Sequence, residues 1–193
     1  SNMKIKKQLL VAAMGVALCG CGEQKPANPF FSEFNTPFGI APFEQITIDH
    51  YREGMLKAME EQMKEVEAII NNPEAPTFEN TIKALDQCGE LMRKVRGTFS
   101  PISSSNATDE TRALQKEMSP LFSAHNDDIY LNPDLFAKVK TVYDNKENLT
   151  LTAEEKKVLQ NIYDRFVDGG ALLNDEQKAE LYNAMAQDTL NIT

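Results

Sequence analysis

The chain has 193 residues, 41% of them hydrophobic and 25% charged, values that fit one globular domain with a substantial core and exclude a disordered segment. Acidic side chains outnumber basic ones by 29 to 20, which gives a formal charge of −9. This balance argues against nucleic acid as a partner, because phosphate binding requires clustered lysine and arginine.

The N-terminus carries features of export. Residues 1–2 have the form of a tag remnant and are set aside. Residues 3–20 begin with lysines and continue into an apolar run of signal-peptide length. This run is too short to span a bilayer, which takes about 20 apolar residues. We therefore predict a lipoprotein signal peptide over residues 3–20.

The end of this segment resembles a bacterial lipobox. Leu18 stands three places before Cys21, and the small Gly20 directly precedes it, whereas the residue before Cys19 is not small. We predict lipidation of Cys21, followed by a polar tether over residues 21–27. The protein would then be lipid-anchored in the bacterial cell envelope, on the periplasmic or outer-membrane face. A plain secretory signal with incidental cysteines is the alternative.

Residues 28–46 are rich in phenylalanine and proline and show neither a helical nor a strand period. We predict an extended segment that lays its aromatic side chains on the helices behind it. Leaving four or five phenylalanines in water would be costly. A flexible linker is the alternative.

From Thr47 the apolar residues recur every three or four positions, which predicts a helical domain over residues 47–193. Pro73 and Pro76 end the first helix, since proline offers no backbone N–H. Thr77 is a suitable N-cap for the second helix. The apolar stripe of the first helix consists of Tyr51, Met55, Met59, Met63, Val66 and Ile70.

The second apolar stripe covers residues 78–95, and we predict its end at Gly97 and the serine-rich stretch 101–106. A third helix is predicted from Thr108. Because Pro120 lies inside its pattern, we expect a kink or a break shortly before it.

The remaining helices are marked by their caps. Asn132 and Pro133 begin one helix, the capping box 152–155 begins the next, and 169–170 is a glycine pair that closes it. The stretch 174–177 begins a last helix, whose apolar stripe runs up to the end of the chain. No strand period occurs. The sequence predicts an all-α domain of about six antiparallel helices, the first two forming a hairpin.

The residues offer little chemistry of their own. His50 and His125 are the only histidines, and neither belongs to an HExxH pair that could share zinc. We expect His50 to be exposed and His125 to be a buried structural residue. Cys88 is expected to be a small buried hydrophobe. No catalytic residue and no metal ligand is predicted in this chain.

Several short segments of the sequence nevertheless resemble a known family. In chain order they are residues 28–30 (NPF), 42–46 (PFEQI) with Tyr51, 72–73 (NP), 76–82 (PTFENTI), 124–127 (AHND) and 129–136 (IYLNPDLF). Together they resemble the N-terminal region of the thimet-oligopeptidase-like zinc metallopeptidases, and among these the bacterial peptidyl-dipeptidases (dipeptidyl carboxypeptidases). The likeness extends over nearly all of residues 28–193.

The resemblance implies a mostly helical, clamshell-shaped enzyme much longer than this chain. Zinc would be held by an HExxH helix in a later part, and the N-terminal helices would form one wall of a deep channel that admits short peptides. This chain is then expected to be the access-limiting domain of an enzyme that removes dipeptides from peptide C-termini. Its expected partners are the missing C-terminal catalytic domain, short peptides and, through Cys21, the membrane.

No catalytic or zinc residue can be carried over, because those positions of the family lie outside this sequence. The 193-residue chain is therefore expected to be inactive alone, with zinc as the cofactor of the full-length enzyme only. Two alternatives stay open. One is a stand-alone helical lipoprotein that acts as a binding module, and the other is an oligopeptidase-type endopeptidase.

Overall fold

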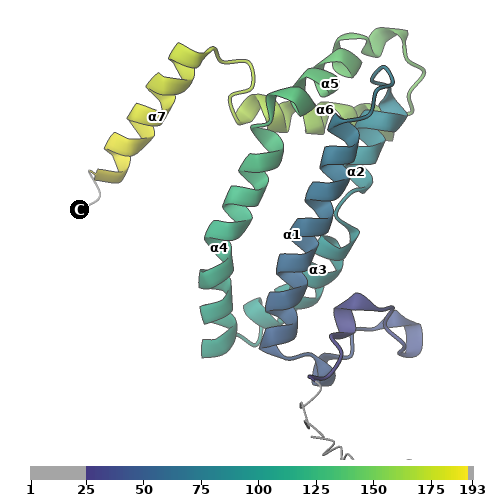
Figure 1. The fold of residues 1–193 in the computed structure, drawn as a ribbon, viewed down its shortest axis with the longest axis vertical. Helices are drawn as coiled ribbons and strands as arrows, with labels where there is room; N and C mark the ends of the chain where they lie inside the picture. Colours follow the sequence, from purple (N-terminus) through teal and green to yellow (C-terminus); the bar gives the residue numbers. More distant parts are fainter. Residues whose placement is uncertain (1–24, 191–193) are drawn as a thin grey trace, which may run out of the picture.

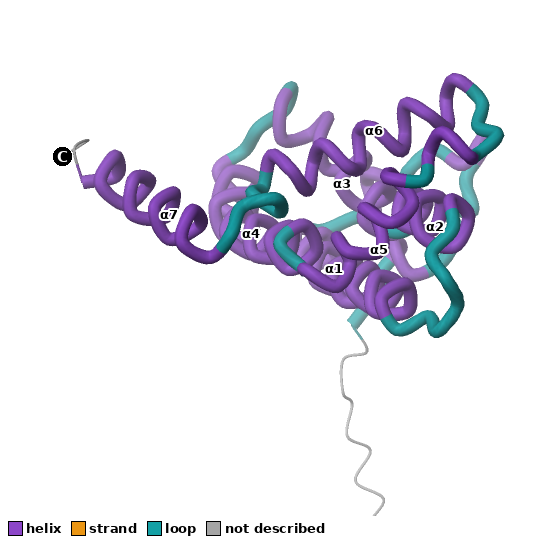
Figure 2. Tube along the Cα trace, turned by 90° about the horizontal axis from the view of Figure 1, so that it is seen from above, coloured by secondary structure: helices purple, strands orange, loops and turns teal. Residues whose placement is uncertain are grey.

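The computed structural model describes residues 25–190 (Figure 1). The predictions for residues 1–2 and 3–20 and for Cys21 lie outside the described residues. Within residues 25–190 every regular element is helical and none is a strand (Figure 2), which confirms the all-α fold with about six helices. The longer helices are α1 (Ile48–Ile70), α3 (Glu90–Ser104), α4 (Asp109–Tyr130), α5 (Pro133–Asp144), α6 (Ala153–Asp168) and α7 (Asp175–Leu190).

The helices α1, α3 and α4 lie side by side and form the body of the domain (Figure 1). α3 returns antiparallel to α1, so the predicted hairpin of the first two helical stretches is confirmed. One end of this body is filled by a core cluster on which the N-terminal segment also packs. Its buried members are Phe30, Tyr51, Met55, Val95, Phe99, Leu114 and Met118.

The other end of the body is closed by α5 and α6, which cross over the ends of α1 and α4 (Figures 1 and 2). A second core cluster lies beneath them and holds these helices together. It comprises Val66, Ile69, Phe78, Ile82, Leu85, Cys88, Ile129, Leu135, Phe136, Val139, Val142, Leu159 and Phe166. Because α1 contributes to both clusters, it ties the two ends into one domain.

Residues 28–46, predicted to be extended, are not extended throughout. The segment forms three single 3-10 turns, two of which begin with proline, a residue whose fixed φ favours a turn start. Phe30 is buried against the core as expected, whereas Phe38 is fully exposed and has a φ of 61°. The turns are η1 (Pro29–Phe31), η2 (Pro37–Gly39) and η3 (Phe43–Gln45).

The second helical stretch begins after Thr77 as predicted but differs from the prediction in its middle and at its end. It breaks at Gly89, whose left-handed φ of 80° separates a π-helical turn, η4 (Phe78–Lys83), and the short α2 (Ala84–Gln87) from α3. α3 then continues past Gly97 to Ser104, although Pro101 lies inside it. Since Pro101 stands in the last turn, it removes only one helical hydrogen bond, which the structure tolerates.

The expected break near Pro120 does not occur, because α4 is one continuous helix with this proline inside. Buried side chains on both sides of the proline, Met118 before it and His125 and Ile129 after it, hold the two halves on the same packed surface. Their burial outweighs the hydrogen bond that the proline removes.

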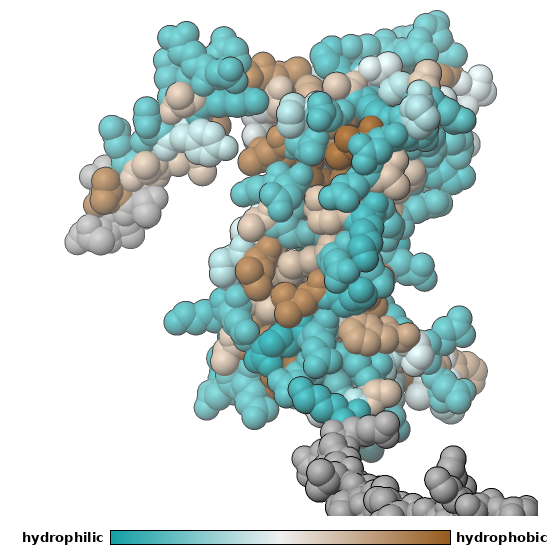
Figure 3. Space-filling model, viewed as in Figure 1, coloured by the Kyte–Doolittle hydropathy of each residue, from teal (hydrophilic) through white to brown (hydrophobic). Residues whose placement is uncertain are grey.

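The last helix, α7, projects away from the body (Figures 1 and 2). Its predicted apolar stripe is exposed, with Leu181 at 45%, Met185 at 58% and Leu190 at 74%. Apolar patches lie on the surface between α7 and the body and along α4 (Figure 3). No helix within residues 25–190 combines the length and apolar character needed to cross a membrane.

Candidate functional site: a polar groove between α3 and α4

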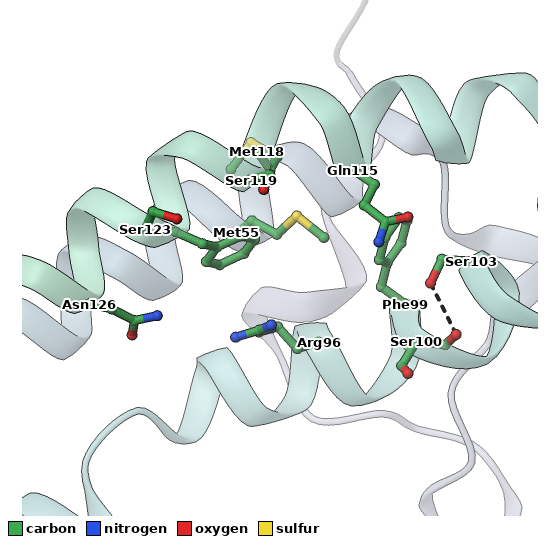
Figure 4. A pocket seen from close by; sticks show the side chains of 11 residues that line it. Met55, Arg96, Phe99, Ser100, Ser103, Gln115, Met118, Ser119, Ser123 and Asn126 are labelled. Atoms are coloured by element: carbon green, nitrogen blue, oxygen red, sulfur yellow. Dashed lines mark hydrogen bonds between the residues drawn. The ribbon is translucent and has the colours of Figure 1, made fainter. Parts of the chain in front are cut away.

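The groove lies between α3 and α4 and has α1 as its floor (Figure 4). Its volume is about 380 Å³, which falls within the usual range of ligand pockets, about 300–1,000 Å³. The lining residues are Met55, Arg96, Phe99, Ser100, Ser103, Gln115, Met118, Ser119, Phe122, Ser123 and Asn126.

The groove exists because serines occupy the facing surfaces of the two helices. Ser100 and Ser103 stand three positions apart on α3, and Ser119 and Ser123 stand four apart on α4, spacings that place each pair on one helix face. A tightly packed helix pair would fill this seam with larger apolar side chains. The small serine side chains leave it open and line it with hydroxyl groups.

The floor of the groove is apolar and rigid. Met55 of α1, Phe99 of α3 and Met118 of α4 are 2%, 7% and 1% exposed and belong to the core cluster at this end of the domain. Packed side chains of this kind hold fixed rotamers, so the floor of the groove is rigid.

Arg96 is the charged group of the groove. It is exposed on α3, and its guanidinium carbon lies 4.7 Å from the centre of the Phe122 ring on α4. Figure 4 shows Arg96 reaching from α3 into the space opposite Ser123 and Asn126. No acidic side chain lines the groove. The arrangement suits a ligand that carries a negative charge and accepts hydrogen bonds.

His50, expected to be exposed, is in fact 7% exposed and serves the start of α1. Its Nδ1 accepts a hydrogen bond from the Thr47 backbone N–H at 3.1 Å, while its own backbone N–H donates to Thr47 Oγ1 at 3.2 Å. The side-chain amide of Asn28 donates to the His50 carbonyl at 2.9 Å and covers the residue. His50 is a capping residue and does not line the groove.

His125 is 6% exposed, as predicted for a structural histidine. Its Nε2 lies 2.7 Å from Oε1 of Gln62 on α1, and burial lowers the pKa of the imidazole. The Gln62 amide nitrogen in turn lies 3.7 Å from Cys88 Sγ. Cys88 is 5% exposed, its thiol donates to the Leu85 carbonyl at 2.9 Å, and burial raises its pKa. These groups are kept neutral and connect α1, α2 and α4.

No group of three or more His, Cys, Asp or Glu side chains within residues 25–190 is placed to hold a metal ion. The described residues therefore do not fit a zinc site, and no chemical step is assigned to a metal through them.

The groove was not predicted from the sequence. The serine-rich stretch 101–106 was expected to end the helix, whereas Ser103 and Ser104 belong to α3. Two features of the sequence could have indicated the groove. Serines recur at helical spacing in two consecutive helices, and an arginine beside them has no acidic residue on the same helix face. Which faces meet, however, becomes clear only from the fold.

The chain is similar to peptidases over most of its length. It is 37% identical over 154 residues to a protein named dipeptidyl carboxypeptidase of Escherichia coli (strain K12), and 36% identical to that of Salmonella typhimurium. Oligopeptidase A of Escherichia coli is 25% identical over 154 residues. No protein-family model matches.

The first two matches cover 80% of this chain but 23% of each relative. The chain thus spans about a quarter of the length of the curated relatives it matches. The resemblance to dipeptidyl carboxypeptidases, which was predicted from short sequence motifs, is confirmed over the matched residues.

Proposed function

We propose that this chain is the N-terminal, access-limiting helical domain of a zinc metallopeptidase that removes dipeptides from the C-termini of short peptides. The observation that carries the proposal is the 37% identity to a dipeptidyl carboxypeptidase over 80% of this chain. Since only 23% of that relative is matched, the larger part of its length remains for a C-terminal catalytic domain. That domain is the partner we propose for this one.

The structure supports a wall-forming role. Both histidines and the thiol of Cys88 are buried and hydrogen-bonded within the domain, so none is available as a nucleophile or general base. Two core clusters connected by α1 make the domain stiff. A stiff helical wall restricts the width of a channel and so selects short, unfolded peptides. Zinc and the chemistry that it supplies would belong to the catalytic domain.

We also propose that the protein is anchored to the cell envelope by lipid on Cys21. The proposal rests on Leu18 and Gly20 before this cysteine and on the apolar run before them. Lipid labelling of cells that express the parent chain and a Cys21→Ser variant tests it. We expect label and membrane association for the parent and neither for the variant, whereas equal labelling of both would reject the anchor.

Two alternatives are separated by experiment. An oligopeptidase-type endopeptidase is supported by the match to oligopeptidase A, but at a lower identity of 25%. A stand-alone binding module would use the groove without any catalytic domain. The three functions differ in metal content and in the peptide products that they give.

The deciding experiment compares the native reading frame with this 193-residue chain. Bound zinc is quantified, and peptides with a free or an amidated C-terminus are offered as substrates. Zinc and stepwise release of dipeptides from free C-termini by the long form establish the proposed function. Internal cleavage regardless of the C-terminus supports the endopeptidase. A long form without zinc or hydrolysis supports the binding module.

A further inference from the structure

The charge of the groove between α3 and α4 is opposite to that of the chain. The chain carries 29 acidic residues and a net charge of −9, yet the groove is lined by Arg96 and no carboxylate. We propose that Arg96 binds a carboxylate group of a peptide that lies in this groove. The proposal rests on the proposed peptidase function and adds an anchoring point for the substrate.

Arg96 differs from every other arginine of the chain. The guanidinium groups of Arg52 and Arg112 pair with carboxylates, that of Arg93 donates to backbone carbonyls and that of Arg165 to a tyrosine hydroxyl. Within residues 25–190, Arg96 has neither an ion pair nor a hydrogen bond. Its N–H donors are therefore available to a ligand.

The contact with Phe122 prepares Arg96 for this role. The guanidinium carbon lies over the Phe122 ring, 4.7 Å from its centre, so the ring face restrains the side chain while its N–H donors stay available. Such a fork matches the two oxygens of a carboxylate. Holding the side chain in advance lowers the conformational entropy that binding would cost.

The rest of the groove suits a short peptide. On α4, Ser119, Ser123 and Asn126 offer donors and acceptors for a peptide backbone, and Asn126 lies opposite Arg96 (Figure 4). The floor of Met55 and Phe99 offers apolar contact for side chains. The carboxylate can come from a free C-terminus or from an aspartate or glutamate side chain, and both would present the same group to Arg96.

The test measures binding of three labelled peptides to the 193-residue chain by fluorescence anisotropy. All share one neutral sequence: the first has a free C-terminus, the second is amidated, and the third is amidated and contains one glutamate. Each is titrated with the parent chain and with the variants Arg96→Ala, Arg96→Lys and Arg112→Ala. Arg112, an exposed arginine of α4 that pairs with Asp109, is the matched control.

We expect the parent to bind at least one carboxylate peptide about ten- to a hundredfold more tightly than the uncharged peptide, as charged hydrogen bonds allow. Arg96→Ala should abolish this preference, Arg96→Lys should keep part of it, and Arg112→Ala should leave it unchanged. The first and third peptides show whether the carboxylate comes from the C-terminus or from a side chain.

Absence of a preference for carboxylate in the parent, or an equal preference in Arg96→Ala, would overturn the proposal. Because Arg96 is exposed, its variants should fold like the parent, which circular dichroism verifies. The two proposals fail separately. Zinc-dependent dipeptide release by the long form without carboxylate binding here rejects only the Arg96 anchor, and carboxylate binding here with an inert long form rejects only the peptidase.

Discussion

The imidazole Nε2 of His125 in α4 lies 2.7 Å from the side-chain oxygen of Gln62 in α1, residues 63 positions apart in sequence. Since an amide oxygen can only accept, Nε2 carries the proton of the neutral ring. The contact links the two helices inside the body of the domain, and the Arg52–Glu117 ion pair links them at the surface. It also explains how the domain should respond to acid.

We predict that the domain loses stability in mild acid because of His125. Burial lowers the pKa of its imidazole below the ordinary 6.5, and the nearby Asp128 carboxylate only partly opposes this. The unfolded chain therefore binds the proton more readily than the folded one. The contribution of His125 to the unfolding free energy is complete above about pH 6.5. It decreases as the pH falls from there to the pKa of the imidazole in the folded protein.

Urea unfolding at several values between pH 7.5 and pH 5 measures this decrease. A His125→Gln variant cannot titrate, so its unfolding free energy should depend less on pH over the same interval. An NMR titration of the imidazole gives the folded pKa directly. Equal pH slopes for parent and variant would contradict the assignment.

A second prediction concerns Gly54 of α1, where the side chains of Phe30 and Val95 both lie close to the helix backbone. A Cβ atom at Gly54 would lie 3.1 Å from a side-chain carbon of each, so this position accepts no larger side chain without movement of the core. We expect Gly54→Val to reduce the unfolding free energy by about 1–3 kcal/mol.

Gly97 in α3 is the matched control, because a Cβ atom there would meet nothing within 4 Å. Gly97→Ala should raise the unfolding free energy by about 0.5–1 kcal/mol through the lower entropy of the unfolded chain. Urea denaturation of both variants provides the comparison. A stable Gly54→Val variant would show that Phe30 does not pack on α1 as described.

A third prediction concerns Lys138, which joins α5 to the end of α1. Its ammonium donates to the carbonyls of Ile69 at 2.9 Å and Asn72 at 2.7 Å, at the point where α1 ends. Lys138→Met keeps the aliphatic stem and removes the donors, and we expect it to cost about 1–3 kcal/mol of unfolding free energy.

The control for this substitution is Lys140→Met on the same helix. Lys140 forms an exposed ion pair with Asp144, and such pairs contribute about 0–1 kcal/mol. Thermal or urea unfolding should therefore separate the two variants. Similar losses for both would mean that the carbonyls of the α1 terminus are satisfied by water when Lys138 is replaced.

Local features of the fold could be predicted from the sequence because the groups involved lie three or four residues apart. The capping pairs Thr152–Glu155 and Asn174–Gln177 form the predicted reciprocal hydrogen bonds. Features that depend on distant residues could not be predicted. His50 is buried because Asn28, 22 positions earlier, bonds to its carbonyl, and the Gly89 N–H at the break before α3 donates to Glu65 of α1.

The groove is one of the features that depend on distant residues. Its serines and Arg96 are visible in the sequence, but their common function depends on which faces of α3 and α4 meet over α1. The periodicity of apolar residues gives the buried face of each helix and leaves open how the polar faces are turned toward one another. For this reason the helical domain could be predicted from the sequence, whereas the candidate site could be identified only in the structure.

The last prediction concerns the start of η4, within the stretch that carries the most specific family resemblance. The backbone N–H of Thr77 donates to Asn80 Oδ1 at 2.7 Å, and that of Asn80 donates to Thr77 Oγ1 at 3.0 Å. The Asn80 side-chain amide also donates to the Ala75 carbonyl at 3.0 Å. Asn80 therefore ties the turn after α1 to the first turn of the next helix.

We expect Thr77→Ala and Asn80→Ala each to reduce the unfolding free energy by about 0.5–2 kcal/mol, the usual cost of a lost cap. The double variant should lose less than the sum, because each single change already breaks part of the same reciprocal pair. A double-mutant cycle in urea measures the coupling. Fully additive losses would show that the two side chains act independently and that the capping box does not hold this turn.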